Sequence, residues 1–267
     1  MTWNKTGLVI AAVLVAGCHS TATLESAEAN QDTRLQTGKL NTTDVPLYGA
    51  EVYSLDKVKY GRFVMRMKLV SNPGVVSSFF TYDNESWQGN LPWREIDIEM
   101  IGKQPNQLQT NLITGELNQR VHSETIHSLE SADDFHIYEL VWTPDEIIWL
   151  VDGEVIHKET AESSEQVIDM RDTPLSYRMN LWVSEAAEWV GAFDKQDLPL
   201  YQYVDWMEYH SFEEGEFVLR WRDNFTHFDR KRWGAGDWSF DSNLVTFAPN
   251  NVFIEDEMLV LALTAEE

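Results

Sequence analysis

The chain has 267 residues, of which 43% are apolar and 12% aromatic, and its formal net charge is −24. This length suits one large globular domain, because all-β sandwiches often exceed 200 residues as a single domain. The acidic balance disfavours nucleic acid as a partner, since phosphate backbones would be repelled, and a neutral partner suits it better than a sulphated one. The eleven Trp residues fit either a core or the binding of flat apolar ligand faces.

The first residues have the pattern of a lipoprotein signal peptide. Lys5 precedes an apolar run over 8–16, which is too short to span a bilayer, and the run leads into LVAGC, which ends at Cys18. This ending resembles the bacterial lipobox, in which the cysteine is acylated; the alternative is an ordinary signal peptide that happens to end near a cysteine. We expect a signal peptide over 1–18 and lipidation at Cys18. The protein would then be secreted and held at a bacterial outer membrane or cell surface through this N-terminal lipid only.

The next residues divide into a tether and a domain. Residues 19–45 are polar without a clear period, which predicts a flexible tether, and the domain is expected over 46–267. Its strand-like segments are 63–69, 75–82, 95–101, 135–142, 146–151, 176–182, 203–209, 216–221 and 258–264. Asp152 and Gly153 predict a tight hairpin, the pattern allows a short helix over 124–129 or over 163–170, and long amphipathic helices are absent from it. This pattern favours an antiparallel β-sandwich.

One segment, WREIDIEM over 93–100, carries the clearest chemical signal. Its three acids, Glu95, Asp97 and Glu99, alternate with apolar residues and therefore share one face of a strand. Three acids on one strand face repel one another, and no basic residue alternates with them. One interpretation is that these acids only form the solvated face of the strand. The other is that they are crowded together among aromatic side chains, an environment in which one acid can stay protonated near neutral pH and act in catalysis.

Paired carboxylates are the groups that glycoside hydrolysis requires. One carboxylate attacks the anomeric carbon and a protonated one donates to the leaving oxygen, with the two groups about 5 to 5.5 Å apart in retaining enzymes. The Cα atoms of Glu95 and Glu99 would lie roughly 13 Å apart along a strand, a gap that two glutamate side chains on a concave sheet could largely close. Asp97 lies between them, so the three would titrate as a coupled set.

The run Glu-Ile-Asp-Ile-Glu resembles the active-site signature of glycoside hydrolase family 16, in the form without an inserted residue before the last Glu. That form is typical of lichenases (1,3-1,4-β-D-glucanases) and plant xyloglucan-modifying enzymes, and the resemblance covers about 48–264. It implies an all-β fold, a jelly-roll β-sandwich of two curved antiparallel sheets with a concave cleft. It also implies Glu95 as nucleophile, Asp97 as its helper and Glu99 as acid/base, with no cofactor in catalysis.

The order of segments departs from most of this family. The stretch over 223–238 resembles one that opens the domain in ordinary members, but here it lies near the C-terminal end. The domain is therefore similar to circularly permuted lichenases, and Glu267 should end beside Tyr48, with the new join over 211–216. Permutation of this kind is plausible because domain termini often lie close together.

The resemblance also implies residues that bind ligands. The expected substrate-binding residues are Phe80, Tyr82, Asn84, Trp93, Gln109, Asn111, Arg178, Asn180, Trp182, Trp189 and Trp238. A structural calcium ion is expected at Asp205, Asn224 and the backbone carbonyl of Glu257, since hard oxygen ligands suit calcium; ordinary surface residues are the alternative.

These features together predict an endo-acting, retaining hydrolase of mixed-linkage 1,3-1,4-β-D-glucan that works as a monomer. Two alternatives stay open. The same fold could act on another β-glucan, such as laminarin or xyloglucan, or the chain could be a non-catalytic surface protein that binds glucan. The presence of both Glu95 and Glu99 disfavours the last, because a lectin does not need them.

Overall fold

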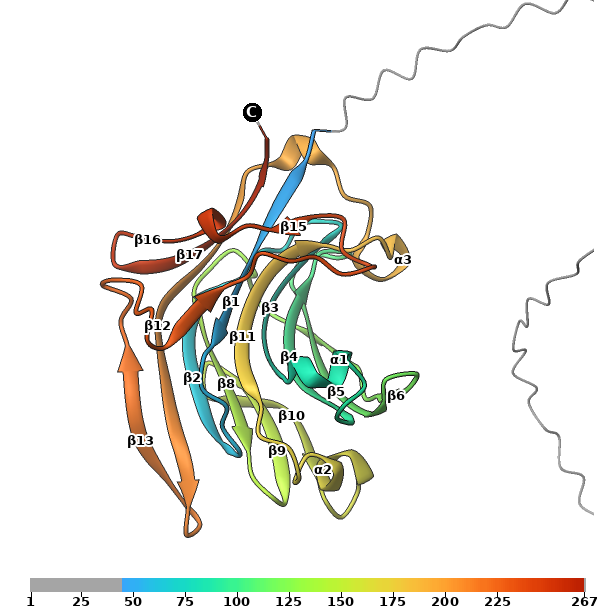
Figure 1. Cartoon of the computed structure of the whole chain (residues 1–267), viewed down its shortest axis with the longest axis vertical. Coiled ribbons are helices and arrows are strands. Elements are labelled where there is room, and N and C mark those ends of the chain that lie inside the picture. Colours follow the sequence, from blue (N-terminus) through green and yellow to red (C-terminus); the bar gives the residue numbers. More distant parts are fainter. Residues whose placement is uncertain (1–44, 267) are drawn as a thin grey trace, which may run out of the picture. The chain divides into compact units, whose positions relative to one another are not determined.

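The computed structural model describes residues 45–266, and the regular secondary structure of this part of the chain is predominantly β-strand (Figure 1). The predicted signal peptide, Cys18 and all but the last residue of the predicted tether lie outside the described residues. The helices between residues 45 and 266 are short: α1 (Asn84–Trp87), α2 (Glu165–Asp169), α3 (Ala187–Val190) and the 3-10 turns η1 (Lys195–Asp197) and η2 (Pro249–Asn251). No helix in this range has the length and apolar character needed to cross a membrane.

The strands form two layers, of which the first, the inner sheet, carries the acidic segment. Its hydrogen-bonded order is β14–β1–β11–β3–β4–β5, and β6 and β7 both pair with β5. The bounds are β14 (Trp233–Ala235), β1 (Leu47–Ser54), β11 (Ser176–Val183), β3 (Val75–Tyr82), β4 (Trp93–Ile101), β5 (Gln107–Glu116), β6 (Gln119–His122) and β7 (Thr125–Ser128). All these pairs are antiparallel, and the central strands are curved, so that one side of the sheet is concave (Figure 1).

The second layer, the outer sheet, has the order β16–β17–β12–β2–β8–β9–β10, and β13 continues beside the second half of β12. Its strands are β16 (Val252–Glu255), β17 (Met258–Ala265), β12 (Leu200–Glu213), β2 (Gly61–Lys68), β8 (His136–Trp142), β9 (Glu146–Val151), β10 (Glu154–Thr160) and β13 (Glu216–Asp223). A further short strand, β15 (Thr246–Phe247), runs parallel to the start of β1.

The core lies between the two sheets and is built from the apolar side of each strand. Phe63 of β2 packs on Phe79 of β3, with ring centroids 5.4 Å apart, and both are fully buried. Trp149 of β9 reaches across the core and donates its indole N–H to the carbonyl oxygen of Asp97, 3.0 Å away. The outer sheet therefore supports the strand that carries the acids from behind.

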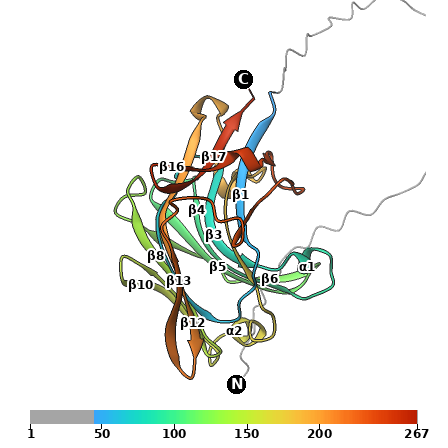
Figure 2. The same ribbon diagram turned by 60° about the vertical axis from the view of Figure 1, so that its left-hand side comes forward.

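The two ends of the domain lie together, as the sequence predicts. Leu47 and Tyr48 at the start of β1 pair with Ala265 and Thr264 at the end of β17, and Figures 1 and 2 both show these strands side by side. Residue 267 itself lies outside the described residues. The predicted join over 211–216 is the tip of the β12–β13 hairpin. The circular permutation stays a prediction, since it concerns the order of segments in relatives.

The predicted strands are confirmed, and one of the two suggested helices is wrong. Helix α2 lies inside the predicted range 163–170. The range 124–129 instead contains strand β7, which pairs with β5 between Gln107 and Thr110. The β-branched Thr125 and Ile126 favour this extended pairing along the free edge of β5 over a short helix.

Candidate active site

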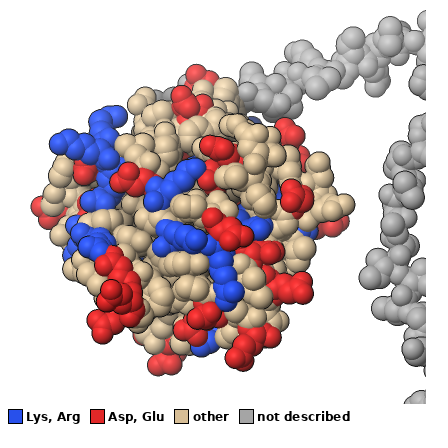
Figure 3. Space-filling model, turned by 60° about the horizontal axis from the view of Figure 1, so that its bottom comes forward, with Lys and Arg blue, Asp and Glu red and all other residues tan. Residues whose placement is uncertain are grey.

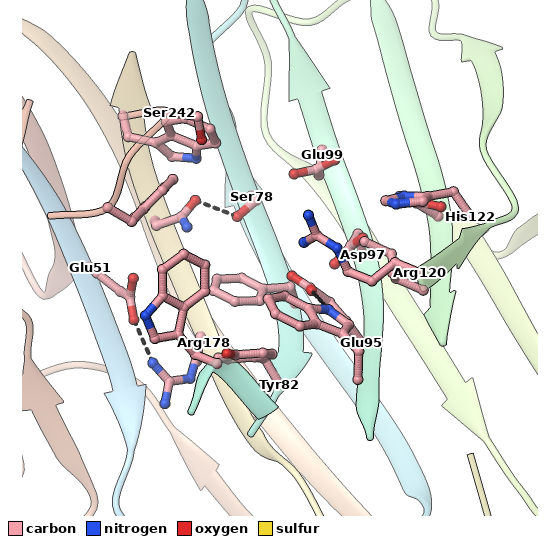
Figure 4. A pocket seen from close by; sticks show the side chains of 18 of the residues that line it. Glu51, Ser78, Tyr82, Glu95, Asp97, Glu99, Arg120, His122, Arg178 and Ser242 are labelled. Carbon is pink, nitrogen blue, oxygen red and sulfur yellow. Dashed lines mark hydrogen bonds and ion pairs between the residues drawn. The ribbon is translucent and has the colours of Figure 1, made fainter. Parts of the chain in front are cut away.

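A cleft of about 850 Å³ lies on the concave side of the inner sheet, across β11, β3, β4 and β5 (Figure 4). Its volume is in the range of ligand-binding clefts. Glu95, Asp97 and Glu99 all line it, and so do the eleven expected substrate-binding residues, Phe80, Tyr82, Asn84, Trp93, Gln109, Asn111, Arg178, Asn180, Trp182, Trp189 and Trp238. The structure thus brings together every residue that the resemblance placed in the cleft.

The alternation along β4 explains why the acids face the cleft. Ile96, Ile98 and Met100 on the other side of the strand are at most 1% exposed and belong to the core. Arg94 also points away from the cleft, and its Nε donates to the carbonyl oxygen of Asp169, 2.6 Å away. Burying this apolar side is worth roughly 25 cal/mol per Å², so the core packing fixes which face the carboxylates occupy.

Glu95 is held by two neighbours on its own strand. The indole N–H of Trp93 donates to Glu95 Oε2 at 2.6 Å, and Asp97 hydrogen-bonds the same carboxyl group. Burial raises the pKa of Glu95 to about 7, while the hydrogen bond from Trp93 and the charges of Arg120 and Arg178 act to lower it.

Glu99 has different surroundings. Its Oε2 accepts a hydrogen bond from Gln109 Nε2 at 3.2 Å, and Gln109 Oε1 in turn accepts from the indole N–H of Trp189 at 3.0 Å. Burial, with the negative charges of Glu95 and Glu124, raises the pKa of Glu99 to about 8, while the hydrogen bond from Gln109 acts to lower it. Glu99 therefore keeps its proton to higher pH than Glu95, which is the order that an acid and a nucleophile need.

Asp97 is the most enclosed of the three acids, with 2% of its surface exposed. Burial and the charges of Glu95 and Glu99 raise its pKa well above the usual range. Its Oδ1 has no hydrogen-bond partner among the described residues. Burial therefore favours the protonated form of Asp97, because a buried neutral carboxyl costs less free energy than a third buried charge.

The walls of the cleft are ordered by polar contacts. Arg178 lies on β11, where its guanidinium forms a buried ion pair with Glu51 of β1 at 2.7 Å and bonds Ser176 at 2.9 Å. Asn180, two residues along, accepts from Ser78 Oγ at 2.7 Å. These contacts fix the side chains that face a ligand, which limits the entropy lost on binding.

The aromatic residues of the cleft fall into two groups. Trp182, Trp189 and Phe240 form one cluster, with Trp182 4.9 Å from Phe240 and 6.3 Å from Trp189 between ring centroids. Trp93 belongs to the other and is only 6% exposed, because Tyr82 packs against it with ring centroids 5.1 Å apart and Arg120 covers it. Trp93 therefore presents its N–H to Glu95 and leaves little of its ring face open to the cleft.

Sequence reasoning missed several lining residues: Glu51, Trp87, Gln88, Arg120, His122, Glu124, Glu185 and the segment 239–242. The register explains two of them. Glu51 pairs with Asn180 across β1 and β11, and His122 pairs with Ile113, which itself pairs with Glu95. Among these residues, only Trp87, an aromatic residue six positions before Trp93, could have been marked by the sequence itself; the structure shows that its side chain is exposed.

The three expected calcium ligands also lie together, around a second pocket away from the cleft. A carboxylate, an amide and a backbone carbonyl are the oxygen donors that calcium prefers. Asp205 Oδ2, however, is 2.6 Å from Arg66 Nη1, and Asn224 Oδ1 accepts from Arg222 Nε at 2.8 Å. The donors fit the ion in kind, but a bound calcium would have to displace both guanidinium groups. Across residues 45–266 no group of three His, Cys, Asp or Glu side chains could hold a metal.

The two-sheet sandwich and the acidic cleft define the class: a β-sandwich with the residues of a glycoside hydrolase. The sequence pattern of the family described as "Glycosyl hydrolases family 16" matches residues 18–208. The chain therefore belongs to this family.

Individual relatives agree with this placement. A β-glucanase of Fibrobacter succinogenes is 44% identical over 225 residues, which cover 81% of this chain and 63% of the relative. A β-glucanase of Brevibacillus brevis is 34% identical and covers 69% of each chain. The solved structure of Bacillus licheniformis β-glucanase has a TM-score of 0.50 at 33% identity and covers 60% of this chain and 70% of its own. The chain thus spans less than two thirds of the length of the Fibrobacter relative.

Proposed function

We propose that the chain is an endo-acting, retaining hydrolase of mixed-linkage 1,3-1,4-β-D-glucan, with Glu95 as nucleophile, Asp97 as its helper and Glu99 as acid/base. The observation that carries this proposal is the pair of glutamates on one face of β4, which line one cleft in unlike surroundings. The unlike surroundings give one group the lower pKa and the other the higher, as a two-carboxylate mechanism requires.

In the first step, Glu95 attacks the anomeric carbon and Glu99 gives its proton to the leaving glycosidic oxygen. In the second step Glu99, now ionised, takes a proton from water, which attacks the same carbon and releases Glu95. The hydrogen bond from Trp93 orients the attacking carboxylate. The two hydrogen bonds that run from Trp189 to Gln109 and from Gln109 to Glu99 orient the acid. Asp97 keeps a proton next to Glu95, so that the strand carries fewer buried charges.

The charges of the cleft favour a neutral polysaccharide. Its lining contains seven acids, Glu51, Glu95, Asp97, Glu99, Glu124, Glu185 and Asp241, and only two cations, Arg120 and Arg178. Arg178 is already paired with Glu51, so little positive charge is left for a sulphate or carboxylate group. On the face of the molecule drawn in Figure 3, basic and acidic side chains are intermixed and give no broad basic patch.

The preference for mixed linkages is supported by the regularity of β4. Its register against β3 runs without a shift from Glu95 to Ile101, as expected for a strand that lacks the extra residue before the last Glu. The names of the Fibrobacter and Brevibacillus relatives, both β-glucanases, are consistent with this substrate class.

Reducing-sugar release from barley mixed-linkage glucan, laminarin and xyloglucan tests the proposal. We expect strong activity on the first substrate, weak activity on the other two, and a loss of roughly a thousandfold or more in Glu95→Gln, because no other group can form the covalent intermediate. Glu154→Gln, an exposed glutamate of the β9–β10 hairpin, is the matched control and should keep full activity.

Each of the other outcomes would change one part of the proposal: the substrate, the class of protein or the nucleophile. Higher activity on laminarin or xyloglucan would move the substrate to another β-glucan. Glucan binding without hydrolysis of any substrate would identify a surface binding protein. Activity that survives Glu95→Gln would show that the nucleophile is wrong.

We also propose that the chain is held at the cell surface by a lipid on Cys18 and works there as a monomer. The basis is the LVAGC sequence after an apolar run of signal-peptide length. In a bacterial host the full chain should partition into the detergent phase, whereas Cys18→Ser should stay in the aqueous phase. Equal partitioning of both would contradict lipidation.

A further inference from the structure

Arg120 lies in register with the residue that holds the proposed nucleophile. Trp93 of β4 pairs with Gly115 of β5, and Gly115 pairs with Arg120 of β6. Residues that face each other across antiparallel strands lie on the same side of the sheet, so Arg120 and Trp93 both face the cleft. Two strand spacings, about 9.6 Å, separate their backbones.

Gly115 leaves the space between them free. It has no side chain, and its φ of +107° is one that other residues rarely adopt. A Cβ at this position would lie 2.4 Å from the carbonyl oxygen of Gln119. Glycine is therefore required here, and its absence of a side chain lets Arg120 extend across β5.

The guanidinium of Arg120 ends above the indole of Trp93, with Cζ 4.5 Å from the ring centroid. A cation over the face of a tryptophan is attracted by the ring quadrupole. The same indole donates its N–H to Glu95 Oε2 at 2.6 Å, and Figure 4 shows Arg120 beside Glu95 and Asp97. The cation, the ring and the carboxylate thus form one connected group.

We propose that Arg120 is a positioning residue of the reaction: stacked on Trp93, its guanidinium supplies the positive charge that keeps the Glu95 carboxylate ionised and ready to attack. This inference rests on the proposed function, in which Glu95 is the nucleophile. Nothing in the sequence pattern marks Arg120, because its partner Trp93 is 27 positions away and two strands across.

The charges around the two glutamates have opposite signs at the two ends of β4. Glu95 is faced by Asp97 and Glu99 on β4, Tyr82 on β3, Arg178 on β11, Arg120 and His122 on β6, and Glu124 after β6. Of these, Arg120 and Arg178 lower the pKa of Glu95 against the larger effect of burial. The charges that act on Glu99 are negative. The β6 segment therefore favours ionisation at one end and protonation at the other.

Of the two arginines that line the cleft, Arg120 is the one whose charge is not offset by a bonded carboxylate of the described residues. Arg178 is buried in its ion pair with Glu51, whose carboxylate offsets much of its charge, whereas no carboxylate of the described residues is bonded to Arg120. Because Arg120 is exposed to solvent, salt screens part of its effect.

The pH profile of kcat/KM tests the proposal. The acid limb reports the group that must be ionised in the free enzyme. Without the positive charge Glu95 holds its proton to higher pH, so Arg120→Gln should move this limb up by about 0.5 to 1 pH unit. On the limb itself kcat/KM would then fall about three- to tenfold, while the loss near the optimum would be smaller.

Three comparisons separate charge from packing. Arg120→Lys keeps the charge and should keep the acid limb near its wild-type position. Arg230→Gln removes an exposed arginine that lies 5.8 Å from the ring centroid of Phe228, outside the residues that line the cleft, and should leave the limb unchanged. A uniform loss at every pH, in both the Gln and the Lys variant of Arg120, would overturn the proposal and leave Arg120 a packing residue. An unmoved limb, or an equal shift in Arg230→Gln, would overturn it as well.

A second measurement does not depend on activity. Titration of ¹³C-labelled glutamate side chains by NMR, with Glu95→Gln to assign the signal, should give a higher pKa for Glu95 in Arg120→Gln than in the wild type. If the wild type hydrolyses no glucan, the proposed function fails, but this titration still decides whether Arg120 controls the ionisation of Glu95. An identical titration in both proteins would overturn the inference alone.

Discussion

Glu95, Asp97 and Glu99 share one strand face, and burial raises the pKa of each because it penalises the ionised form. In the unfolded chain such carboxyls ionise near pH 4, whereas in the folded protein they keep protons to higher pH. The folded state therefore binds more protons above about pH 4, so these groups lower the free energy of unfolding as the pH rises. Hydrogen bonds from Trp93 and Gln109 hold the site together against this cost.

The role of Glu99 can be separated from that of Glu95 by an added nucleophile. In Glu99→Ala no group protonates the leaving oxygen, so kcat/KM on mixed-linkage glucan should fall about 10² to 10⁴-fold. An aryl glycoside with a phenolate leaving group needs no such proton, and its covalent intermediate should accumulate because the base for water is missing. Azide needs no base, so it should restore turnover and yield a β-glycosyl azide by ¹H NMR.

Glu95→Ala provides the matched comparison. Without a nucleophile, azide would attack the substrate directly from the opposite face and give the α-glycosyl azide. Azide that rescues neither variant, or gives the same anomer in both, would contradict the assignment of the two glutamates to different roles.

At the scale of elements, the sequence predicts what depends on near neighbours. The alternation over residues 93–100 predicts both the strand and the face that its acids occupy, because the period of two is local. Tight hairpins such as the one at Asp152 and Gly153 are local as well, and the structure confirms a two-residue turn between β9 and β10.

The edge of the inner sheet beyond β5 could not be predicted in the same way. Strands β6 and β7 are only four residues long, too short for a clear alternation, and Thr125–Ser128 was open to a helical interpretation. What makes them strands is pairing with β5 on its free edge. The position of Arg120 over Trp93 follows from this pairing and from the gap at Gly115, so no reading of the segment alone could place it in the cleft.

Most of the expected cleft residues could be placed only through the resemblance to a family. Trp189 and Trp238 are far from Glu95 in sequence, and nothing local distinguishes them from core tryptophans. The structure brings them to the cleft because β11 lies between β1 and β3 in the inner sheet, and the segment after β14 returns to the end of β11, where the N–H of Leu244 bonds the carbonyl oxygen of Val183. The composition shows that aromatic residues are abundant, but it does not show which of them face the cleft.

At the scale of the whole molecule, the fold is closed by contacts between its two ends. Strand β1 pairs with β11 and β14 in the inner sheet and with β17 and β15 at its start. Asn251 in η2 adds hydrogen bonds from its side chain to the carbonyl oxygens of Tyr48 and Ala262, both 3.0 Å long. Contacts between residues some 200 positions apart therefore order the strand that carries Glu51.

A calcium ion at Asp205, Asn224 and the Glu257 carbonyl would add a second tie of this kind, joining β12, the segment after β13 and the turn between β16 and β17. We expect calcium to raise the Tm over that in EDTA, because an ion that binds only the folded state stabilises it. For a domain of this size, each 1 kcal/mol added to the free energy of unfolding raises the Tm by about 2 to 4 °C. Differential scanning calorimetry of the metal-free protein, with and without added calcium, measures the shift.

Two variants show whether the shift comes from this pocket. Asp205→Asn removes the carboxylate and should abolish it. Arg66→Gln removes the guanidinium that now pairs with Asp205 at 2.6 Å, so it should enlarge the response to calcium while lowering the Tm in EDTA slightly, because an exposed ion pair is worth about 0 to 1 kcal/mol. If the wild type and Asp205→Asn respond alike, calcium does not bind here, and Arg66 and Arg222 provide the positive charge that neutralises this part of the outer sheet.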